Sequence, residues 1–238
     1  MERTQQVNII VLVCANSEWQ AVKEYFSKPR INTSPSGEWF QQTIPVNGQN
    51  IPLVFLQTGW GKIAAAAGTQ YVLDHWQPDL LVNLGTCGGF AGDVEREATI
   101  LATGALVYDI VNQIGDFQSA IDHYTTELKL PWLPKPYPHP VIPALIVSGD
   151  RDLIPTELPM LREKYEAIAG DWESGAVAYV ATKNGVDCLI LRGVSDLVSE
   201  SGGEVYGNHA AYKQITRRIM HSLLVQLPDW LAAFPGKV

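Results

Sequence analysis

Two acidic segments stand out in the last third of the chain. Asp171-Trp172-Glu173 occupies a predicted turn before a helix of small residues, and Ser195-Asp196 follows an apolar strand predicted at 188–192. Loops at the ends of strands in α/β sheets expose side chains on a rigid support, and ligands commonly bind there. The carboxylates of Glu173 and Asp196 are therefore candidates for contact with a ligand.

Two earlier apolar runs also lead into polar segments. The strand predicted at 79–84 continues into the glycine-rich segment 85–90, read as a turn that would present backbone amides and the Thr86 hydroxyl to a polar ligand. The strand predicted at 7–15 leads into Ser17 and Glu18, where Ser17 and Gln20 have the spacing of a capping box. Glu18 would open a helix, where an acidic side chain complements the helix dipole even without a chemical role.

A third loop carries an indole. Trp60 lies between Gly59 and Gly61, which predicts a backbone that bends and approaches another group closely. Lys62 follows, but the segment lacks the GxxxxGK[ST] spacing of a phosphate-binding loop. We interpret Lys62 as a solvated residue at the start of a helix over 63–76.

Short apolar runs alternate with helical patterns along most of the chain. This alternation predicts a three-layer αβα fold, of the α/β class, with a mixed, mostly parallel central sheet, and residues 1–238 are expected to form a single domain. Asn47-Gly48 predicts a hairpin turn, and the last helix is expected over 209–227. The irregular segment 111–143, rich in proline from 131 onward, is expected to be a lid or an interface segment, or else a stiff surface excursion.

The amino-acid composition limits the classes of molecule that the protein is expected to bind. The 238 residues carry a formal net charge of -8 and a pI near 5.1, which argues against nucleic-acid and membrane-surface binding. The widely spaced Cys14, Cys87 and Cys188 predict reduced, buried thiols rather than disulfides or a zinc site. The apolar run at 9–15 is too short for a membrane span or a secretory signal. We expect a cytoplasmic protein with no metal or cofactor.

Five segments taken together resemble the purine nucleoside phosphorylase superfamily. They are TGWGKIAAAA (58–67), NLGTCGGF (83–90), IVSGD (146–150), DWESGAVAYVA (171–181) and RGVSD (192–196). Within that superfamily the chain most resembles the 5′-methylthioadenosine/S-adenosylhomocysteine nucleosidases, including their plant relatives, over roughly residues 8–225. The resemblance implies a nucleoside phosphorylase-like fold and an N-glycosidase that releases adenine from a 5′-substituted, methylthioadenosine-like adenosine.

The resemblance also implies three catalytic roles. In the family, water attacks the anomeric carbon while an acid protonates purine N7, and Asp196 matches that acid, with Ser195 orienting its carboxyl group. Glu173 matches the carboxylate that accepts hydrogen bonds from the ribose hydroxyls. Glu18 matches the glutamate that activates water if one residue is deleted from the preceding loop, whereas an ungapped alignment would place Trp19 there.

Several substrate-binding positions follow from the same comparison. Thr86 stands at the family's serine position, and Gly88 lies in the same glycine-rich segment. Trp172 stands where the family usually has methionine. Trp60 replaces a small aliphatic residue that borders the 5′-substituent, which predicts a narrower or reshaped 5′ pocket in which a large homocysteine tail is not expected to fit.

The base pocket departs from the family at residues 151–153. Family members place an aromatic residue there to stack on adenine, whereas this chain has Arg151, Asp152 and Leu153. Arg151 would either stack through its planar guanidinium or form a surface ion pair with Asp152. Tyr206 or Tyr212 is expected to supply the family's aromatic residue from the last helical region.

The nucleophile and the class of function are the remaining choices. Asn83 stands where phosphorylases of the superfamily carry an arginine for phosphate, so water is the expected nucleophile. The alternatives are a non-catalytic nucleoside-binding or storage-type relative, and a phosphorylase or hydrolase for another purine nucleoside. Because the family commonly forms dimers in which the partner helps to close the 5′ pocket, we expect a homodimer.

Overall fold

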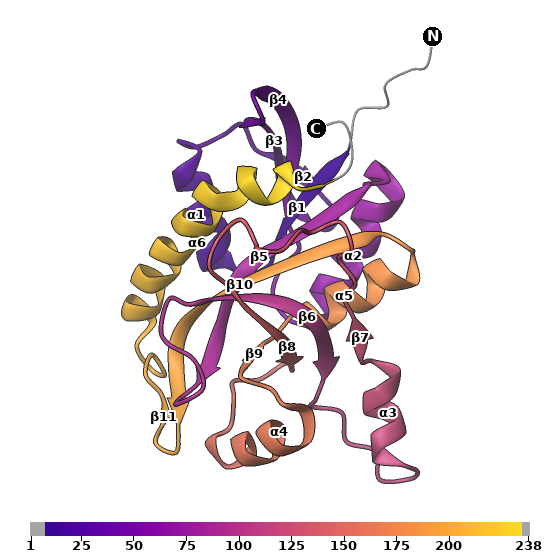
Figure 1. Ribbon diagram of the computed structural model, residues 1–238, viewed down its shortest axis with the longest axis vertical. Helices are drawn as coiled ribbons and strands as arrows, with labels where there is room; N and C mark the ends of the chain where they lie inside the picture. The colour runs from indigo at the N-terminus through magenta and orange to yellow at the C-terminus, as the bar shows by residue number, and fades with distance from the viewer. Residues whose placement is uncertain (1–7, 235–238) are drawn as a thin grey trace.

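The structure is a computed structural model that describes residues 8–234. A mixed sheet runs through its centre, with α1 (Asn16–Tyr25) and α6 (His209–Ala232) on one face and α2 (Lys62–Trp76) and α5 (Ser174–Lys183) on the other (Figure 1). The α/β fold with helices on both faces of a mixed sheet, as predicted, is confirmed.

The remaining helical segments are α3 (Phe117–His123), η1 (Pro155–Glu157) and α4 (Leu158–Tyr165). The strands are β1 (Ile9–Val13), β2 (Asn32–Ser34), β3 (Gly37–Val46), β4 (Gln49–Gln57), β5 (Leu80–Phe90), β6 (Thr99–Val107), β7 (Thr126–Glu127), β8 (Ile142–Ser148), β9 (Ala169–Asp171), β10 (Asp187–Ser199) and β11 (Gly202–Gly203). The predicted hairpin is present between β3 and β4, with Asn47 and Gly48 both at positive φ.

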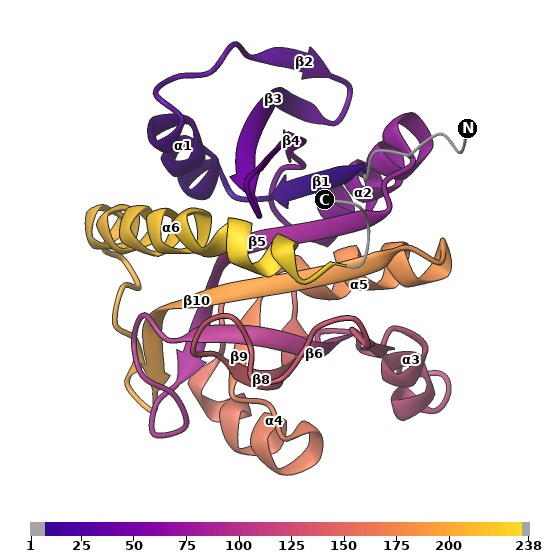
Figure 2. The same ribbon diagram turned by 45° about the horizontal axis from the view of Figure 1, so that its top comes forward.

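Strand order explains where a site can form. The four central strands run parallel in the order β4-β1-β5-β10. β10 also pairs with β6, and β6-β8-β9 leads back to β5, so these five strands close into a ring. In Figure 2, β10 lies between β5 and β6. The sequence pattern gave no indication of this closure, which brings β5, β9 and β10 side by side.

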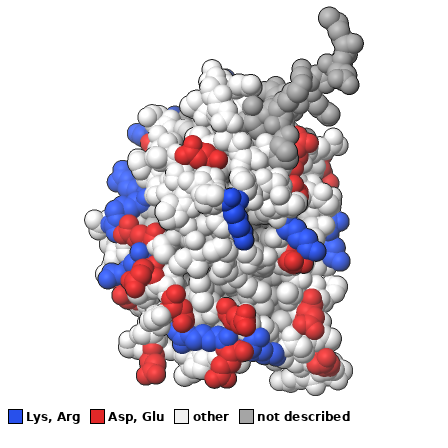
Figure 3. Space-filling model, viewed as in Figure 1, with Lys and Arg blue, Asp and Glu red and all other residues white. Residues whose placement is uncertain are grey.

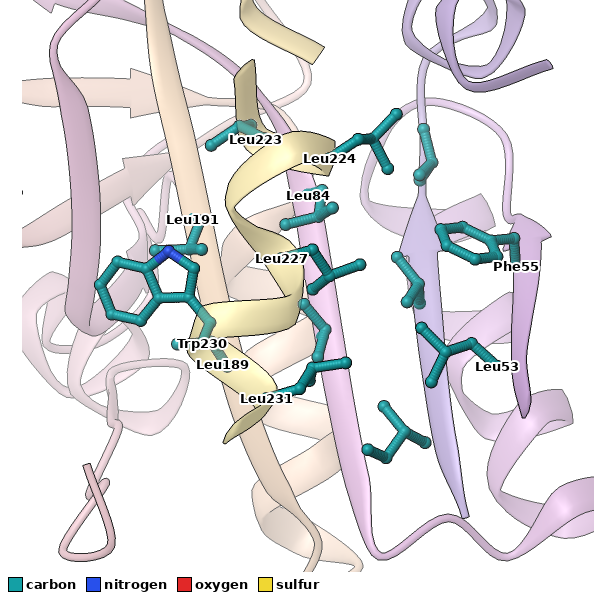
Figure 4. Packing of buried hydrophobic residues seen from close by; sticks show 14 of the residues in the cluster. Leu53, Phe55, Leu84, Leu189, Leu191, Leu223, Leu224, Leu227, Trp230 and Leu231 are labelled. Atoms are coloured by element: carbon teal, nitrogen blue, oxygen red, sulfur yellow. The ribbon is translucent and has the colours of Figure 1, made fainter. Parts of the chain in front are cut away.

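Helix α6 holds the sheet from one side. Its buried leucine and tryptophan side chains face leucines of β5 and β10 (Figure 4); the set comprises Leu84, Leu189, Leu191, Leu223, Leu224, Leu227, Trp230 and Leu231. Full burial of one such side chain stabilises the fold by roughly 1.5–3 kcal/mol. On the opposite face, the small buried residues Ala65, Ala176 and Ala178 let α2 and α5 lie close to the strands. The strands that carry the candidate site are therefore held rigidly from both faces.

The glycine-rich segment 85–90 is not a turn, so that prediction was wrong. β5 continues through it to Phe90, and its glycines have no positive φ. The glycines serve close packing instead: a Cβ on Gly85 would lie 2.5 Å from Nη1 of Arg192 and 2.9 Å from Oε1 of Glu18. A glycine within a strand commonly marks such a close approach.

The boundaries of two other elements differ from prediction for local reasons. Helix α1 begins at Asn16 with Ala15 as its N-cap, because Oε2 of Glu18 accepts a hydrogen bond from Ala15 N at 3.1 Å; the predicted Ser17 cap was wrong. The strand predicted at 188–192 extends to Ser199, with a register shift between Val194 and Asp196. Asp196 therefore projects from a bulge inside a strand, and bulges are known to re-aim side chains.

Residues 130–141 of the proline-rich region lie against the C-terminal part of α6. Trp132 and Tyr137 pack against the core on that side, and His139 Nε2 lies 2.8 Å from Oδ2 of Asp229. The lid or interface role predicted for 111–143 stays a prediction.

Charge and metal-ligand groups are dispersed. On the face in Figure 3, acidic and basic side chains are interspersed. Over residues 8–234, no helix is long and apolar enough to cross a membrane. The same residues contain no group of three or more potential metal ligands. The three cysteines are buried free thiols, as predicted.

Candidate active site

A cavity of about 660 Å³ opens beside β5, β9 and β10, near the first turns of α1 and α6. Every residue predicted from the sequence to act on or bind the substrate lines it, namely Glu18, Trp60, Thr86, Gly88, Arg151, Asp152, Leu153, Trp172, Glu173, Ser195 and Asp196. Tyr206 and Tyr212, between which the sequence did not choose, line it as well. The fold thus brings together predicted catalytic residues as far apart in the sequence as Glu18 and Asp196.

Glu18 is fixed at one end of the cavity by three donors. Its Oε1 accepts hydrogen bonds from Thr86 N at 2.6 Å and Thr86 Oγ1 at 2.8 Å, while Oε2 accepts from Ala15 N. Burial raises the pKa of Glu18, and the nearby Arg192 and these hydrogen bonds oppose that shift. Glu18 is therefore more than a residue that complements the helix dipole.

Arg192 is a buried cation behind Glu18 that the sequence analysis did not single out. Its Nε donates to Asp171 Oδ2 at 2.7 Å and its Nη2 to Asn83 Oδ1 at 2.6 Å, but Nη1 has no partner among the described residues. Burial alone would lower the pKa of Arg192. The negative charges of Asp171 and other acidic groups raise it by more, so the guanidinium stays charged. Both Nη1 and Oε1 of Glu18 lie within 3 Å of the Cβ position of Gly85, so the two atoms are near neighbours.

Asp171 holds Arg192 in place and is itself held by two serines. Besides Arg192, it accepts hydrogen bonds from Ser148 Oγ at 2.6 Å and Ser174 Oγ at 2.5 Å. The signal for Arg192 in the sequence was a charged residue at the end of an apolar run. A buried charge needs a partner, and the neighbouring Asp171 supplies it.

Glu173 lies between β9 and α5, and its Oε1 accepts a hydrogen bond from Gly61 N at 2.9 Å. Burial, followed by the charges of Asp171 and Glu18, raises the pKa of Glu173 to about 8. Glu18 has three donors and Glu173 has one, and hydrogen bonds from donors favour the ionised form. Glu18 therefore has more hydrogen bonds that favour its ionised form than Glu173 has.

Asp196 faces the cavity with one unpartnered oxygen. Ser195 Oγ lies 2.7 Å from Oδ1 of Asp196, whereas Oδ2 is buried and has no hydrogen-bond partner among the described residues. Burial raises the pKa of Asp196; the bond from Ser195 lowers it, and Glu204 and Asp152 raise it. Burial therefore shifts Asp196 toward its protonated form, the form that can donate a proton.

Two indoles meet at the mouth of the cavity. The ring centroids of Trp60 and Trp172 are 5.6 Å apart with planes inclined by 55°, and Trp60 is 61% exposed. Gly59 and Gly61 have φ values of 86° and 85°, so the glycines around Trp60 adopt the backbone bend predicted for them. Gly61 also binds Glu173, which ties the Trp60 loop to the candidate sugar-binding carboxylate.

Arg151 lines the cavity but does not pair with Asp152, and its stacking on a base stays a prediction. Its Nη2 binds Glu157 Oε2 at 2.6 Å, and its guanidinium carbon lies 5.0 Å from the centroid of the Tyr108 ring. The predicted ion pair with Asp152 was wrong, because Arg151 pairs instead with Glu157, six residues later in the chain. Lys62 is not free in solvent either, since its Nζ forms an ion pair with Asp109.

Two tyrosines reach the cavity from the segment around the start of α6. Tyr212 OH lies 3.3 Å from Oγ1 of Thr86, next to Glu18. Tyr206 OH donates to Leu153 O at 3.0 Å, on the side of Asp196. Tyr212 therefore lies on the side of the cavity formed by Thr86 and Glu18, and Tyr206 on the side of Asp152 and Leu153.

The family model described as "Phosphorylase superfamily" matches residues 9–224. The chain belongs to this superfamily. Curated relatives include 5′-methylthioadenosine/S-adenosylhomocysteine nucleosidases of Geobacillus kaustophilus, 26% identical over 64% of this chain and 70% of the relative, and of Actinobacillus succinogenes, 29% identical over 63% and 70%.

Solved structures share the fold at lower identity. A Helicobacter pylori nucleosidase mutant with 5′-methylthioadenosine in its active site has a TM-score of 0.76 and 17% identity, covering 97% of this chain and 100% of its own. The Arabidopsis thaliana 5′-methylthioadenosine nucleosidase has a TM-score of 0.76 and 20% identity, covering 98% of each chain. The superfamily fold is therefore present over nearly the whole of this chain.

Proposed function

We propose that the protein is an N-glycosidase that hydrolyses a 5′-substituted adenosine, such as methylthioadenosine, and releases adenine. The observation that carries the proposal is one cavity lined both by Asp196, whose pKa is raised, and by Glu18, whose carboxyl group is held by three hydrogen-bond donors. Such a cavity holds an acid for the leaving base and a base for water. The nucleosidase names of the relatives support the same reaction.

Asp196 is the general acid in this mechanism. The bond between the anomeric carbon and N9 breaks with its electron pair moving to the purine, and Oδ2 of Asp196 gives its proton to N7. Adenine then leaves as a neutral molecule, and Ser195 donates a hydrogen bond to the carboxylate that remains on Asp196. General acid catalysis of this kind contributes typically 10² to 10⁴ in rate.

Glu18 is the general base for water. Water adds its oxygen to the anomeric carbon and passes one proton to Glu18, which Thr86 and Ala15 hold in position. The hydroxyl of Tyr212, 3.3 Å from Oγ1 of Thr86, would help to orient that water. The products are adenine and the 5′-substituted ribose.

Glu173 holds the ribose. Its carboxyl group accepts hydrogen bonds from the 2′- and 3′-hydroxyls, and its position at the end of β9 keeps it on rigid support. The ionised form of Glu173 would stabilise the positive charge that develops on the sugar in the transition state. Thr86, Gly88 and Trp172 complete the wall around the sugar.

Water rather than phosphate is the nucleophile. Asn83 is buried and its amide is used internally, donating to Leu12 O at 3.0 Å and accepting from Arg192. The carboxylate of Glu18 would repel a phosphate dianion at the same end of the cavity. The hydrolase is therefore favoured over a phosphorylase.

The indole pair selects a small apolar 5′-substituent. Trp60 and Trp172 offer apolar faces beside the ribose side of the cavity. The homocysteine tail of S-adenosylhomocysteine brings a carboxylate, and the nearby Arg151 is already paired with Glu157. Methylthioadenosine is therefore the better substrate of the two.

The protein acts as a homodimer. Four apolar side chains, Trp60, Ile63, Val111 and Ile114, are between 61% and 101% exposed at the start of α2 and in the loop before α3. The Lys62–Asp109 ion pair joins these two segments. A second subunit that covers them would also border the Trp60 side of the cavity.

A non-catalytic nucleoside-binding protein is the second candidate. The exposed carboxylate of Asp152, where the family has a stacking aromatic residue, favours it because stacking on the base is lost. A binder has no need of Glu18, Glu173 and Asp196 together, so hydrolysis remains the better explanation.

Release of adenine from 5′-methylthioadenosine by the purified protein tests the function. We expect turnover at the same rate with and without inorganic phosphate, and a lower kcat/KM for S-adenosylhomocysteine. Strict phosphate dependence would show that the nucleophile is misassigned. Tight binding without base release, from this and other purine nucleosides, would establish the second candidate instead.

A further inference from the structure

Asp152 is an unusual carboxylate within the cavity. The other acidic residues that line it, Glu18, Asp171, Glu173 and Asp196, all accept hydrogen bonds from the protein. Among the described residues, Asp152 has neither a hydrogen-bond nor an ion-pair partner, and its side chain is exposed to the cavity and solvent. An ionised carboxylate of this kind is a strong acceptor that is left for a ligand.

The neighbouring cation is not available to Asp152. Arg151 is bound to Glu157 at 2.6 Å and stacked on Tyr108. The geometry around Arg151 therefore turns its charge away from Asp152 and leaves the carboxylate facing the cavity.

Asp152 and Asp196 both line the cavity on the side of Tyr206. After burial, the negative charges of both residues are the leading causes that raise the pKa of Tyr206. Asp152 also contributes, after burial and Glu204, to the raised pKa of Asp196 itself. Leu153, next in the chain, lies against β5, with its Cδ1 3.1 Å from the Cβ position of Gly88. Asp152 thus lines the same part of the cavity as Asp196, next to the proposed position of the base.

The structure of a purine predicts which group of the base would lie next to Asp152. N7 and the substituent on C6 are neighbours along one edge of the ring. If the protonated Asp196 donates to N7, an ionised carboxylate beside it faces the 6-substituent. An amino group donates a hydrogen bond to this carboxylate, whereas a carbonyl oxygen presents lone pairs that the carboxylate repels.

We propose that Asp152 is a specificity-determining residue that accepts a hydrogen bond from the exocyclic amino group of the base and thereby selects 6-amino over 6-oxo purine nucleosides. The inference rests on the proposed function, because it takes Asp196 to face N7. At the position where the family has a stacking aromatic residue, this chain would instead make a polar contact with the base.

The first test compares 5′-methylthioadenosine with 5′-methylthioinosine, which differ at C6 and in protonation of N1. We expect the wild-type protein to favour the amino compound in kcat/KM. In Asp152→Asn, the side-chain amide can donate as well as accept, so the preference should fall roughly ten- to a hundredfold, the value of a hydrogen bond to a charged group. An unchanged ratio in Asp152→Asn overturns the inference.

Glu204→Gln is the matched control. Glu204 also raises the pKa of Asp196, but it binds Leu197 N at 3.0 Å and does not line the cavity. The groups around Asp196 are Ser195, Glu204, Asp152 and Tyr206, and removing either negative charge should move the alkaline limb of kcat/KM to lower pH. Only Asp152→Asn should also change the amino-to-oxo ratio; an equal change in Glu204→Gln would refute direct contact.

Binding of the free bases separates this inference from the proposed reaction. Calorimetry with adenine and hypoxanthine needs no turnover. Wild type should bind adenine at least tenfold more tightly, and Asp152→Asn should lose most of that difference. Equal affinities in wild type overturn the inference even if nucleosides are hydrolysed, whereas a difference that depends on Asp152 without any hydrolysis supports it and refutes only the N-glycosidase.

Discussion

Asp196 and Glu173 are both buried carboxyl groups with raised pKa values, but their neighbours differ. Asp196 has one oxygen bound by Ser195 and one buried oxygen with no hydrogen-bond partner among the described residues, whereas Glu173 is bound by the Gly61 amide and lies near Asp171 and Glu18. In the proposed reaction the first carboxyl group serves the leaving base and the second the ribose. Each can be tested by an isosteric amide.

Asp196→Asn should abolish release of adenine from methylthioadenosine while largely sparing nucleoside binding. The amide keeps the shape and the bond with Ser195 but cannot transfer a proton to N7. Single-turnover kinetics and calorimetric binding measure the two effects separately. Turnover at the wild-type rate would show that the acid is misassigned.

Glu173→Gln should make stability less dependent on pH. The pKa of Glu173 is about 8 in the folded protein against 4.5 for an ordinary glutamate, so between these values the folded state binds more protons than the unfolded state. Stability therefore falls as pH rises through this window, by up to about 1.4 kcal/mol per pH unit for one whole proton.

Urea unfolding at several pH values between 5 and 8 measures this slope. The glutamine variant should lose part of it, and its gain in stability over wild type should grow toward pH 8. A parallel shift of both curves, with the same slope, would contradict the protonation of Glu173 in the folded state.

At the scale of elements, β5 decides whether the cavity can form. Its glycines let the strand pass directly against Arg192 and Glu18, and the bulge in β10 turns Asp196 toward the same space. Neither feature is a loop, although loops are where binding residues are usually expected.

Gly85→Ala should reduce kcat/KM at least tenfold and destabilise the fold by roughly 1–3 kcal/mol, a common cost of overpacking. The added methyl would lie 2.5 Å from Nη1 of Arg192 and 2.9 Å from Oε1 of Glu18, so these groups must separate. Kinetics and thermal unfolding measure both effects.

Gly115→Ala is the matched control, because the nearest atom to its Cβ position is 3.5 Å away in the side chain of Asn112. It should leave activity and stability close to wild type. If Gly85→Ala behaved like Gly115→Ala, the close packing of Glu18 and Arg192 over β5 would be refuted.

The sequence predicted most elements of this fold but not the contacts between them. The apolar runs of β1, β5 and β10 and the hairpin at Asn47 are set by local pattern, and the structure has them. The glycines of β5 were read as a turn because a close approach to Arg192, more than 100 residues away, leaves no local signal. The partners of Arg192 and Arg151 were missed for the same reason, since ion pairs depend on tertiary neighbours.

The whole molecule has two different surfaces, one on each side of the sheet. α6 covers one face and α2 the other (Figure 1). The start of α2 and the loop before α3 carry exposed apolar side chains. Exposed apolar groups that lie together commonly mark an interface. The expected homodimer would use the face of α2.

Ile63→Glu should shift the protein from dimer to monomer in light scattering coupled to size-exclusion chromatography. Ile63 is 84% exposed on α2, and a buried charge at an interface is costly. Val225→Glu on α6, where Val225 is 53% exposed, is the matched control and should leave the dimer intact. A monomer in the wild-type protein would refute the dimer.

The contact between Trp60 and Trp172 also gives the cavity its own optical signal. Indole rings whose centroids are 5.6 Å apart couple electronically, and a ligand that enters beside them changes both their coupling and their exposure to water. Tryptophan fluorescence and near-ultraviolet circular dichroism should therefore follow occupancy without an added label. Trp60→Phe should remove most of that signal, so stopped-flow fluorescence can time the arrival of nucleoside separately from the release of adenine.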